Sequence, residues 1–312
     1  MKSKTAQNRS AKPLPSTEAV HPLGRDLDQK NNAEALACFT EVDEEAVRAV
    51  AGARSPMAKA IDLIASCLRD GGRLIYVGAG TSGRLAALDA AELPPTFQSE
   101  ASQVQALLAG GPRAMTHAIE GAEDDHGQGG RDLQAMGPGP LDCIFGITAS
   151  GGAPYVHGAL EAGRAAGAHT IFLACIPPSE RPDDYDISIR LLTGPELLAG
   201  STRLKAGTAT KLALNAISTL AMARLGKLYG HLMVDVNTSG NSKLWDRGVR
   251  MVSEITGLSR EEAEPLLRRA NGSVKTACTM HAHGIEVEPA NQLLALHGGH
   301  LRAALMSPTI DS

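Results

Sequence analysis

Two sets of carboxylates in this 312-residue chain are of the kind that acid–base catalysis uses. Glu92 follows an almost wholly apolar helical turn and precedes residues 93–95, Leu-Pro-Pro. Apolar surroundings disfavour the charged form of a carboxyl group, so we expect the pKa of Glu92 to be raised and its side chain to donate a proton. The second set is an acidic run that contains Glu120, Glu123 and two aspartates. Such runs are also typical of solvated loops, so a purely structural interpretation of this set stays open.

Residues 78–83, Gly-Ala-Gly-Thr-Ser-Gly, have the composition of an anion-binding turn. They lie between an apolar run and a helical pattern, and Thr81 or Ser82 is the expected N-cap of that helix. The free N–H groups and the positive dipole end of a helix start favour a phosphate. The spacing fits neither a P-loop nor a complete dinucleotide-binding motif, because the acidic residue expected about 20 positions later is missing. The alternative is a strand-to-helix turn that binds nothing.

Residues 144–155 repeat this arrangement of an apolar strand, a Ser-Gly turn and a helix. Ser150 and Gly151 form the turn, and Pro154 suits the first turn of the helix. Two such turns would lie together at the carboxyl edge of one sheet, where open α/β folds bind ligands. The alternative is again a pair of tight turns without a ligand.

A third segment combines hydroxyls with cations. Ser201 and Thr202 are expected to cap a helix whose first turns carry Arg203 and Lys205. Hydroxyls, a helix N-terminus and a cation can together hold a phosphate dianion. The helix dipole disfavours cations at the start of a helix. Two cations at this unfavourable position therefore indicate a functional role. The alternative is a solvated basic face.

The elements that must position these groups indicate an α/β fold. Apolar runs separated by helical patterns predict a doubly wound, five-stranded parallel sheet with right-handed crossovers. The expected strands are residues 74–77, 104–109, 141–148, 170–174 and 187–192. Helices are expected over residues 27–53, 56–68 and 203–225. The last of these has a wide apolar stripe and small residues almost all round, which favours a second buried face against a partner subunit.

Three regions follow from these patterns. Residues 1–17 are polar and lack periodicity, which is typical of a disordered tail. Residues 18–257 hold the sheet domain with its N-terminal helices. Residues 258–312 predict a small C-terminal helical bundle, in which a capping-box pattern at Ser259 opens the first helix. Further helices of the bundle are expected over residues 274–283 and 288–296.

Composition excludes several classes of function. A net charge of −4 gives no electrostatic reason to expect nucleic acid or an anionic membrane as a partner. Five scattered cysteines indicate reduced thiols in a cytoplasmic protein, and neither a membrane-spanning segment nor a secretory leader is expected. His281 and His283 lack an accompanying acidic ligand pattern, so we expect no metal.

Several long motifs, taken together, resemble the N-acetylmuramic acid 6-phosphate etherases, a bacterial family built on the sugar isomerase (SIS) fold. The similarity extends from about residue 17 into the C-terminal bundle, and the motifs occur in family order. The motifs are VGAGTSGRLAALDAAELPPTF, AIEGAEDD, ASGGAPYVHGALEAG, GSTRLKAGTATKLALNAIS and GKLYGHLMVDV.

The resemblance implies a cofactor-independent lyase that removes the D-lactyl ether from C3 of N-acetylmuramic acid 6-phosphate. In the ring-opened sugar the C1 aldehyde acidifies the C2 proton, so a base, an acid and a water molecule are needed. The family motifs place the proton donor at Glu92 and the other catalytic residue at Glu123. They also imply a homodimer with its sites near the subunit boundary.

The same resemblance implies which residues hold the sugar phosphate. They are Gly80, Thr81, Ser82, Ser150, Gly151, Ser201 and Thr202, with Lys205 nearby. Glu196 joins them because related isomerases of this fold have a catalytic glutamate shortly before a Ser-Thr-Lys segment.

Departures from the family pattern concern the edge of the expected site. Gly152 and Ala153 stand where the family commonly has Arg and Thr, and Leu93 replaces a common Cys. Two other functions stay open: a phosphosugar isomerase, which uses the same proton abstraction, and a non-catalytic sugar-phosphate sensor. A DNA-binding sensor would need a strongly basic segment, which neither end of the chain has.

Overall fold

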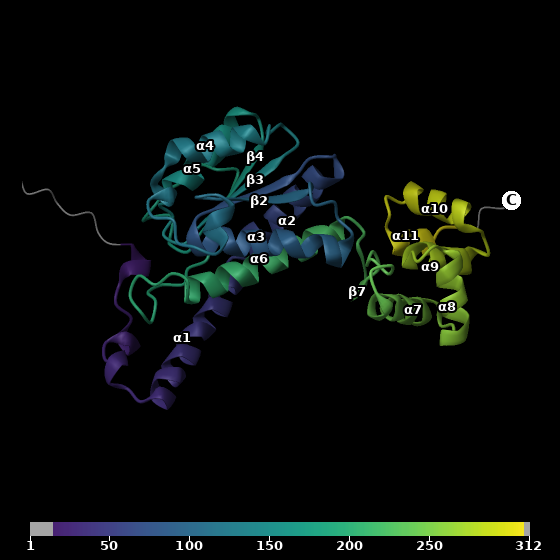
Figure 1. Ribbon diagram of the computed structural model, residues 1–312, viewed down its shortest axis with the longest axis horizontal. Helices are drawn as coiled ribbons and strands as arrows, with labels where there is room; N and C mark the ends of the chain where they lie inside the picture. The colour runs from purple at the N-terminus through teal and green to yellow at the C-terminus, as the bar shows by residue number, and fades with distance from the viewer. Residues whose placement is uncertain (1–14, 309–312) are drawn as a thin grey trace, which may run out of the picture.

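The computed structural model describes residues 15–308 (Figure 1). Most of the predicted tail, residues 1–14, lies outside the described residues. Its last residues differ from the expectation, because Ser16–Glu18 forms a short 3-10 helix in which Thr17 is fully buried. The Ser16 N–H donates to the Glu180 carboxylate at 2.8 Å, which fastens this N-terminal turn to the sheet domain.

The predicted five-stranded parallel sheet is confirmed, with the strand order β2-β1-β3-β4-β5. The strands are β1 Leu74–Gly78, β2 Val104–Leu108, β3 Cys143–Thr148, β4 His169–Ala174 and β5 Ile187–Arg190. A two-stranded antiparallel hairpin follows the sheet domain, β6 Leu228–Tyr229 with β7 Leu232–Met233. The order reverses between β1 and β3, and this switch point is where open α/β sheets bind ligands.

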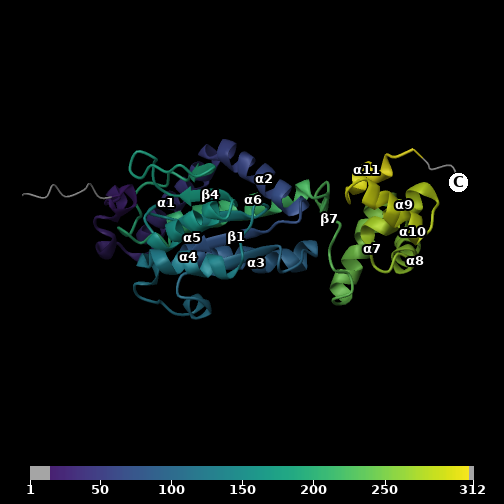
Figure 2. The same ribbon diagram turned by 90° about the horizontal axis from the view of Figure 1, so that it is seen from above.

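Helices cover both faces of the sheet (Figures 1 and 2). Those of the sheet domain are α1 Asn32–Gly52, α2 Arg54–Arg69, α3 Gly80–Phe97, α4 His126–Ala135, α5 Pro154–Ala165 and α6 Lys205–Arg224. Alternate residues of β1 enter two different cores: Tyr76 packs on the side of α2, α3 and α6, and Ile75 packs on the side of α4 and α5. Among the helices of residues 15–308, none combines the length and the apolar composition that a bilayer span requires.

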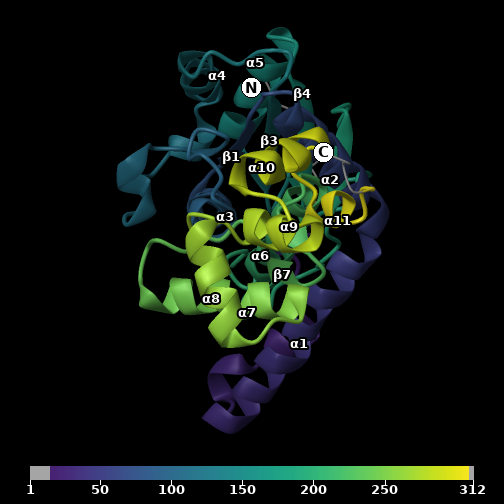
Figure 3. The same ribbon diagram turned by 90° about the vertical axis from the view of Figure 1, so that its right-hand side faces the viewer.

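Helix α1 projects from the sheet domain (Figures 1 and 3). A capping box of Asn31 and Glu34 opens it. Its buried residues, Val42, Ala46 and Ala49, all lie in its second half. The first half therefore extends beyond the rest of the domain.

The C-terminal helical bundle has a hydrophobic core of its own. Its helices are α7 Ser242–Thr256, α8 Arg260–Arg269, α9 Val274–His283, α10 Val287–Leu296 and α11 Leu301–Leu305. The predicted capping box of Ser259 and Glu262 is present. Helix α7, which lies before the expected start at residue 258, also contributes Val249 and Val252 to this core.

Asp235 joins the bundle to the sheet domain. Its carboxylate lies 3.2 Å from Lys227, just after α6, and 2.6 Å from Lys275 of α9. All three side chains are at least three-quarters buried.

Replacement of Asp235 by Ala should lower the free energy of unfolding by about 3 kcal/mol, because it leaves the buried Lys275 and the partly buried Lys227 without a partner. Urea denaturation measures this change. The control is Asp246→Ala, which removes two exposed ion pairs of α7, one of them to Arg260 of α8, and should cost less than about 1 kcal/mol. Equal effects of the two substitutions would contradict a linking role for Asp235.

Candidate active site

A cavity of about 310 Å³ lies at the carboxyl edge of β1 and β3. The lining contains members of all three predicted turns and one member of the acidic run. These are Gly80, Thr81, Ser82, Glu123, Ser150 and Thr202. The structure therefore brings together segments that are far apart in the sequence, at the position where a doubly wound sheet binds its ligand.

The first turn differs in detail from the prediction. Helix α3 begins at Gly80 and its N-cap is Ala79, which makes no side-chain capping bond, so neither Thr81 nor Ser82 is the cap. Gly80 has φ = +52°, a left-handed conformation that glycine adopts without strain. Thr81 and Ser82 lie in the first turn, where backbone N–H groups have no intrahelical partner and can bind an anion.

Gly83 allows this turn to lie close to the sheet. A Cβ at Gly83 would lie 2.6 Å from the Gly78 carbonyl oxygen and 2.3 Å from Cδ1 of Leu108. We expect Gly83→Ala to push α3 away from β1, to destabilise the fold by about 1–3 kcal/mol and to weaken phosphosugar binding. Thermal unfolding and calorimetric titration measure the two effects. Gly52→Ala is the control, because a Cβ there meets no atom within 4 Å; a similar loss in this variant would contradict the packing argument.

The second turn, residues 149–153, is confirmed as the lead into α5. Pro154 occupies the first turn of that helix, as predicted. Gly151 has φ = +71°, and its carbonyl lies 2.9 Å from Nε2 of His157. The other ring nitrogen of His157 lies 2.8 Å from the Tyr185 hydroxyl. Ser150 lines the cavity, whereas Gly151 lies beside it.

The third segment is arranged differently from the prediction. Helix α6 begins at Lys205, and neither Ser201 nor Thr202 caps it. The carboxylate of Glu196 instead accepts the N–H groups of Lys205 and Ala206, both at 2.9 Å. Burial raises the pKa of Glu196, although these two amides oppose the rise. Glu196 is 1 % exposed and does not line the cavity, so its carboxylate is committed to the start of α6.

Lys205 also points away from the cavity. Its side chain is buried, and its ammonium group pairs with Glu45 of α1. Thr202 lines the cavity, whereas Ser201 and Lys205 do not. Lys205 therefore connects α1 to the start of α6, and its charge is already compensated.

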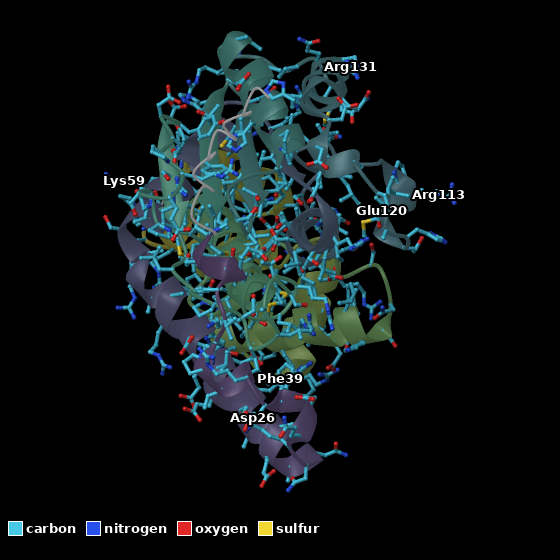
Figure 4. The ribbon with its side chains drawn as sticks, turned by 90° about the vertical axis from the view of Figure 1, so that its left-hand side faces the viewer. Asp26, Phe39, Lys59, Arg113, Glu120 and Arg131 are labelled. Atoms are coloured by element: carbon cyan, nitrogen blue, oxygen red, sulfur yellow. The ribbon has the colours of Figure 1, made fainter. Side chains whose placement is uncertain are left out.

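Two carboxylates line the cavity. Glu123 belongs to a 3-10 turn, Ala122–Asp124, before α4. Glu120 of the same acidic run lies on a segment that projects from the body of the protein (Figure 4). The second lining carboxylate is Glu18, from the N-terminal turn. The sequence analysis missed Glu18, because it adjoins the predicted tail and no motif singles it out.

Glu92 lies elsewhere in the single chain. It occupies α3 twelve residues after Gly80, about 18 Å along the helix axis at 1.5 Å per residue. Its side chain is exposed, so the burial expected from its apolar sequence neighbours is not found. Glu92 lines a second cavity of about 670 Å³ that Lys211, Asn215 and His231 also line. Within one chain the structure does not bring Glu92 and Glu123 together.

The second cavity contains a buried carboxyl group, Asp89. Its oxygens accept hydrogen bonds from the Tyr76 hydroxyl at 3.0 Å and the Ser218 hydroxyl at 3.1 Å. Burial raises the pKa of Asp89, and these two hydrogen bonds act in the opposite direction. In the described part of the chain, no three His, Cys, Asp or Glu side chains gather as a metal site would require.

The five-stranded parallel sheet with a hydroxyl-lined cavity at its carboxyl edge fits a sugar isomerase (SIS) type of domain. Residues 56–164 match the family of the glucokinase regulatory protein N-terminal SIS domain. The chain is 50% identical over 289 residues to an N-acetylmuramic acid 6-phosphate etherase of Synechocystis sp., covering 93% of this chain and 94% of the relative. It is 51% identical over 291 residues to the etherase of Nostoc punctiforme, with the same coverage. The chain belongs to the N-acetylmuramic acid 6-phosphate etherase family, which confirms the resemblance seen in its motifs.

Proposed function

We propose that this enzyme, a carbon–oxygen lyase by family, cleaves the D-lactyl ether of N-acetylmuramic acid 6-phosphate and releases D-lactate and N-acetylglucosamine 6-phosphate. The observation that carries the proposal is the 50% identity to an etherase over 93% of the chain. The cavity supports it, because helix N-termini and hydroxyls that suit a phosphate lie beside the carboxylate of Glu123.

The chemistry assigns two roles to carboxyl groups. In the ring-opened sugar, Glu123 removes the C2 proton, and the electron pair forms a C2–C3 double bond while the C3–O bond breaks. A proton from Glu92 neutralises the departing lactate oxygen. Water then adds to the alkene, with its hydroxyl group on C3 and a proton on C2, which gives the product sugar without a cofactor.

The separation of the two glutamates requires a second copy of the chain. Glu92 lies about 18 Å along α3 from Gly80, which lines the cavity beside Glu123, and this is too far for one sugar phosphate to reach. Glu92 of the partner subunit would then complete the site. Leu88 lies one turn before Glu92 and is 47% exposed, and Leu220 of α6 is 48% exposed. A two-fold dimer that pairs this apolar surface with itself, about an axis that runs across α3, would set the two copies of α3 antiparallel and bring each Glu92 toward the start of the opposite α3.

The cysteines support a cytoplasmic location. All five are free, and only Cys38 is more than slightly exposed. Reduced thiols of this kind are typical of the cytoplasm.

The direct test is incubation with N-acetylmuramic acid 6-phosphate and enzymatic measurement of D-lactate. We expect stoichiometric release of D-lactate and N-acetylglucosamine 6-phosphate. Aldose–ketose conversion of a phosphosugar without lactate release would instead identify an isomerase, and binding without turnover would identify a sensor.

A further inference from the structure

Among residues 15–308, no cationic side chain lines the cavity. Its lining contains two carboxylates, Glu18 and Glu123, and no Lys, Arg or His. A phosphate monoester carries close to two negative charges at neutral pH, so hydroxyls and amides alone would leave its charge poorly compensated beside these carboxylates. A cation at the edge of the cavity would offset the charge of these carboxylates.

Two cations close to the lining residues in sequence are already engaged. The guanidinium of Arg84 donates to the backbone carbonyls of the 114–117 segment, at 2.9 to 3.2 Å. The ammonium of Lys205 pairs with Glu45. Arg203 is exposed and belongs to the third turn. The side-chain contacts of Arg84 and Lys205 therefore lie away from the second turn.

Arg181 does pack against the second turn. It lies on the segment between β4 and β5, and its guanidinium fills the space above Gly152. A Cβ on Gly152 would lie 2.8 Å from one terminal nitrogen of Arg181 and 2.9 Å from Cζ. The absence of a side chain at Gly152 therefore makes room for Arg181. Ser150, two residues earlier, lines the cavity, and its hydroxyl lies 3.4 Å from the Gly152 nitrogen.

The segment that carries Arg181 is held in place while its charge stays uncompensated. Arg190 of β5 donates to the Arg181 carbonyl at 2.7 Å and also pairs with Asp183. Within residues 15–308, no carboxylate lies within 4.0 Å of the Arg181 guanidinium nitrogens. The backbone is thus positioned, and the fork of donors beside the second turn has no acidic partner.

We propose that Arg181 binds the phosphate group of the substrate at the edge of the cavity, and this inference rests on the proposed function only for the identity of the sugar. A guanidinium offers two parallel N–H donors that match two phosphate oxygens. Arg181 from one side, and the amides and hydroxyls of the first and second turns from the other, would then share the dianion.

Calorimetric titration tests the proposal with two probes, inorganic phosphate and N-acetylglucosamine 6-phosphate. Arg181→Ala should weaken the binding of both by about 10- to 100-fold, which is the usual contribution of hydrogen bonds to a charged group. Arg181→Lys should recover part of the affinity, because it restores the charge without the fork. The control is Lys59→Ala, which removes one positive charge at an exposed position on α2 (Figure 4) and should leave the affinities unchanged.

Three results would overturn the proposal. The first is an unchanged affinity of folded Arg181→Ala for both probes. If only the KM for the lactyl substrate rose in that variant, Arg181 would bind the lactyl carboxylate and not the phosphate. The second is a loss confined to Arg203→Ala. The third is failure of the wild-type protein to bind either probe. A wild-type protein that binds phosphate but releases no lactate would overturn the proposed function alone, because the titrations require no turnover.

Discussion

Replacement of Glu123 by Gln should lower the rate of D-lactate release by roughly 10²- to 10⁴-fold, the usual contribution of a positioned general base. A carboxamide keeps the size of the side chain but does not accept the C2 proton. The same variant should stop exchange of the C2 proton with deuterium from the solvent, which mass spectrometry of recovered substrate measures. Phosphosugar binding should persist, because the hydroxyls and helix N-termini of the cavity are unchanged.

Glu120→Gln is the matched control for this experiment. It removes a carboxylate from the same acidic run, but on the segment that projects from the body of the protein (Figure 4). It should leave both lactate release and exchange close to the wild-type values. Undiminished exchange in Glu123→Gln would assign the base to another group, and Glu18 is the other carboxylate that lines the cavity.

Hybrid dimers of Glu92→Gln and Glu123→Gln subunits should regain activity that neither variant has alone. If each site takes Glu123 from one chain and Glu92 of the partner subunit, a hybrid holds one intact site and one site with both substitutions. Random association yields about half hybrids, so an equal mixture should show about a quarter of the wild-type rate. Purification through two different affinity tags isolates the hybrid, whose expected rate is about half.

The control for the hybrid experiment pairs Glu123→Gln subunits with subunits that carry both substitutions. No arrangement of these chains contains an intact site, so this hybrid should stay inactive. If both glutamates instead act within one chain, each site of the Glu92→Gln and Glu123→Gln hybrid has one substituted glutamate. That hybrid would then stay inactive. An inactive, folded hybrid would therefore reject the shared site while leaving the role of Glu123 untouched.

The sheet could be predicted closely because its strands are short apolar runs between helices. Every expected strand overlaps an observed one, and Val274–His283 has the predicted bounds of its helix. Helix α7 was not predicted, although Asn241 caps it. The signals that succeeded are local ones, in which a residue's own neighbours decide its backbone conformation.

The failures concern features that distant residues decide. Glu196, nine residues before Lys205, takes the capping role that local hydroxyls were expected to have. Glu92 has apolar sequence neighbours, but successive helical residues point about 100° apart, so Leu93 is buried while Glu92 is exposed. No pattern in the sequence places Arg181 above Gly152, because that contact joins two loops of the tertiary structure.

The pairing of Lys205 with Glu45 has a consequence for how far the chain can be shortened. A truncated protein that began at α2 would retain every residue lining the cavity except Glu18. It would lose Glu45, however, and the buried ammonium group of Lys205, the first residue of α6, would have no counter-ion. An isolated buried charge costs several kcal/mol, and here it would destabilise the start of α6, which lines the cavity. The projecting helix therefore belongs to the smallest unit of the chain that keeps the cavity intact.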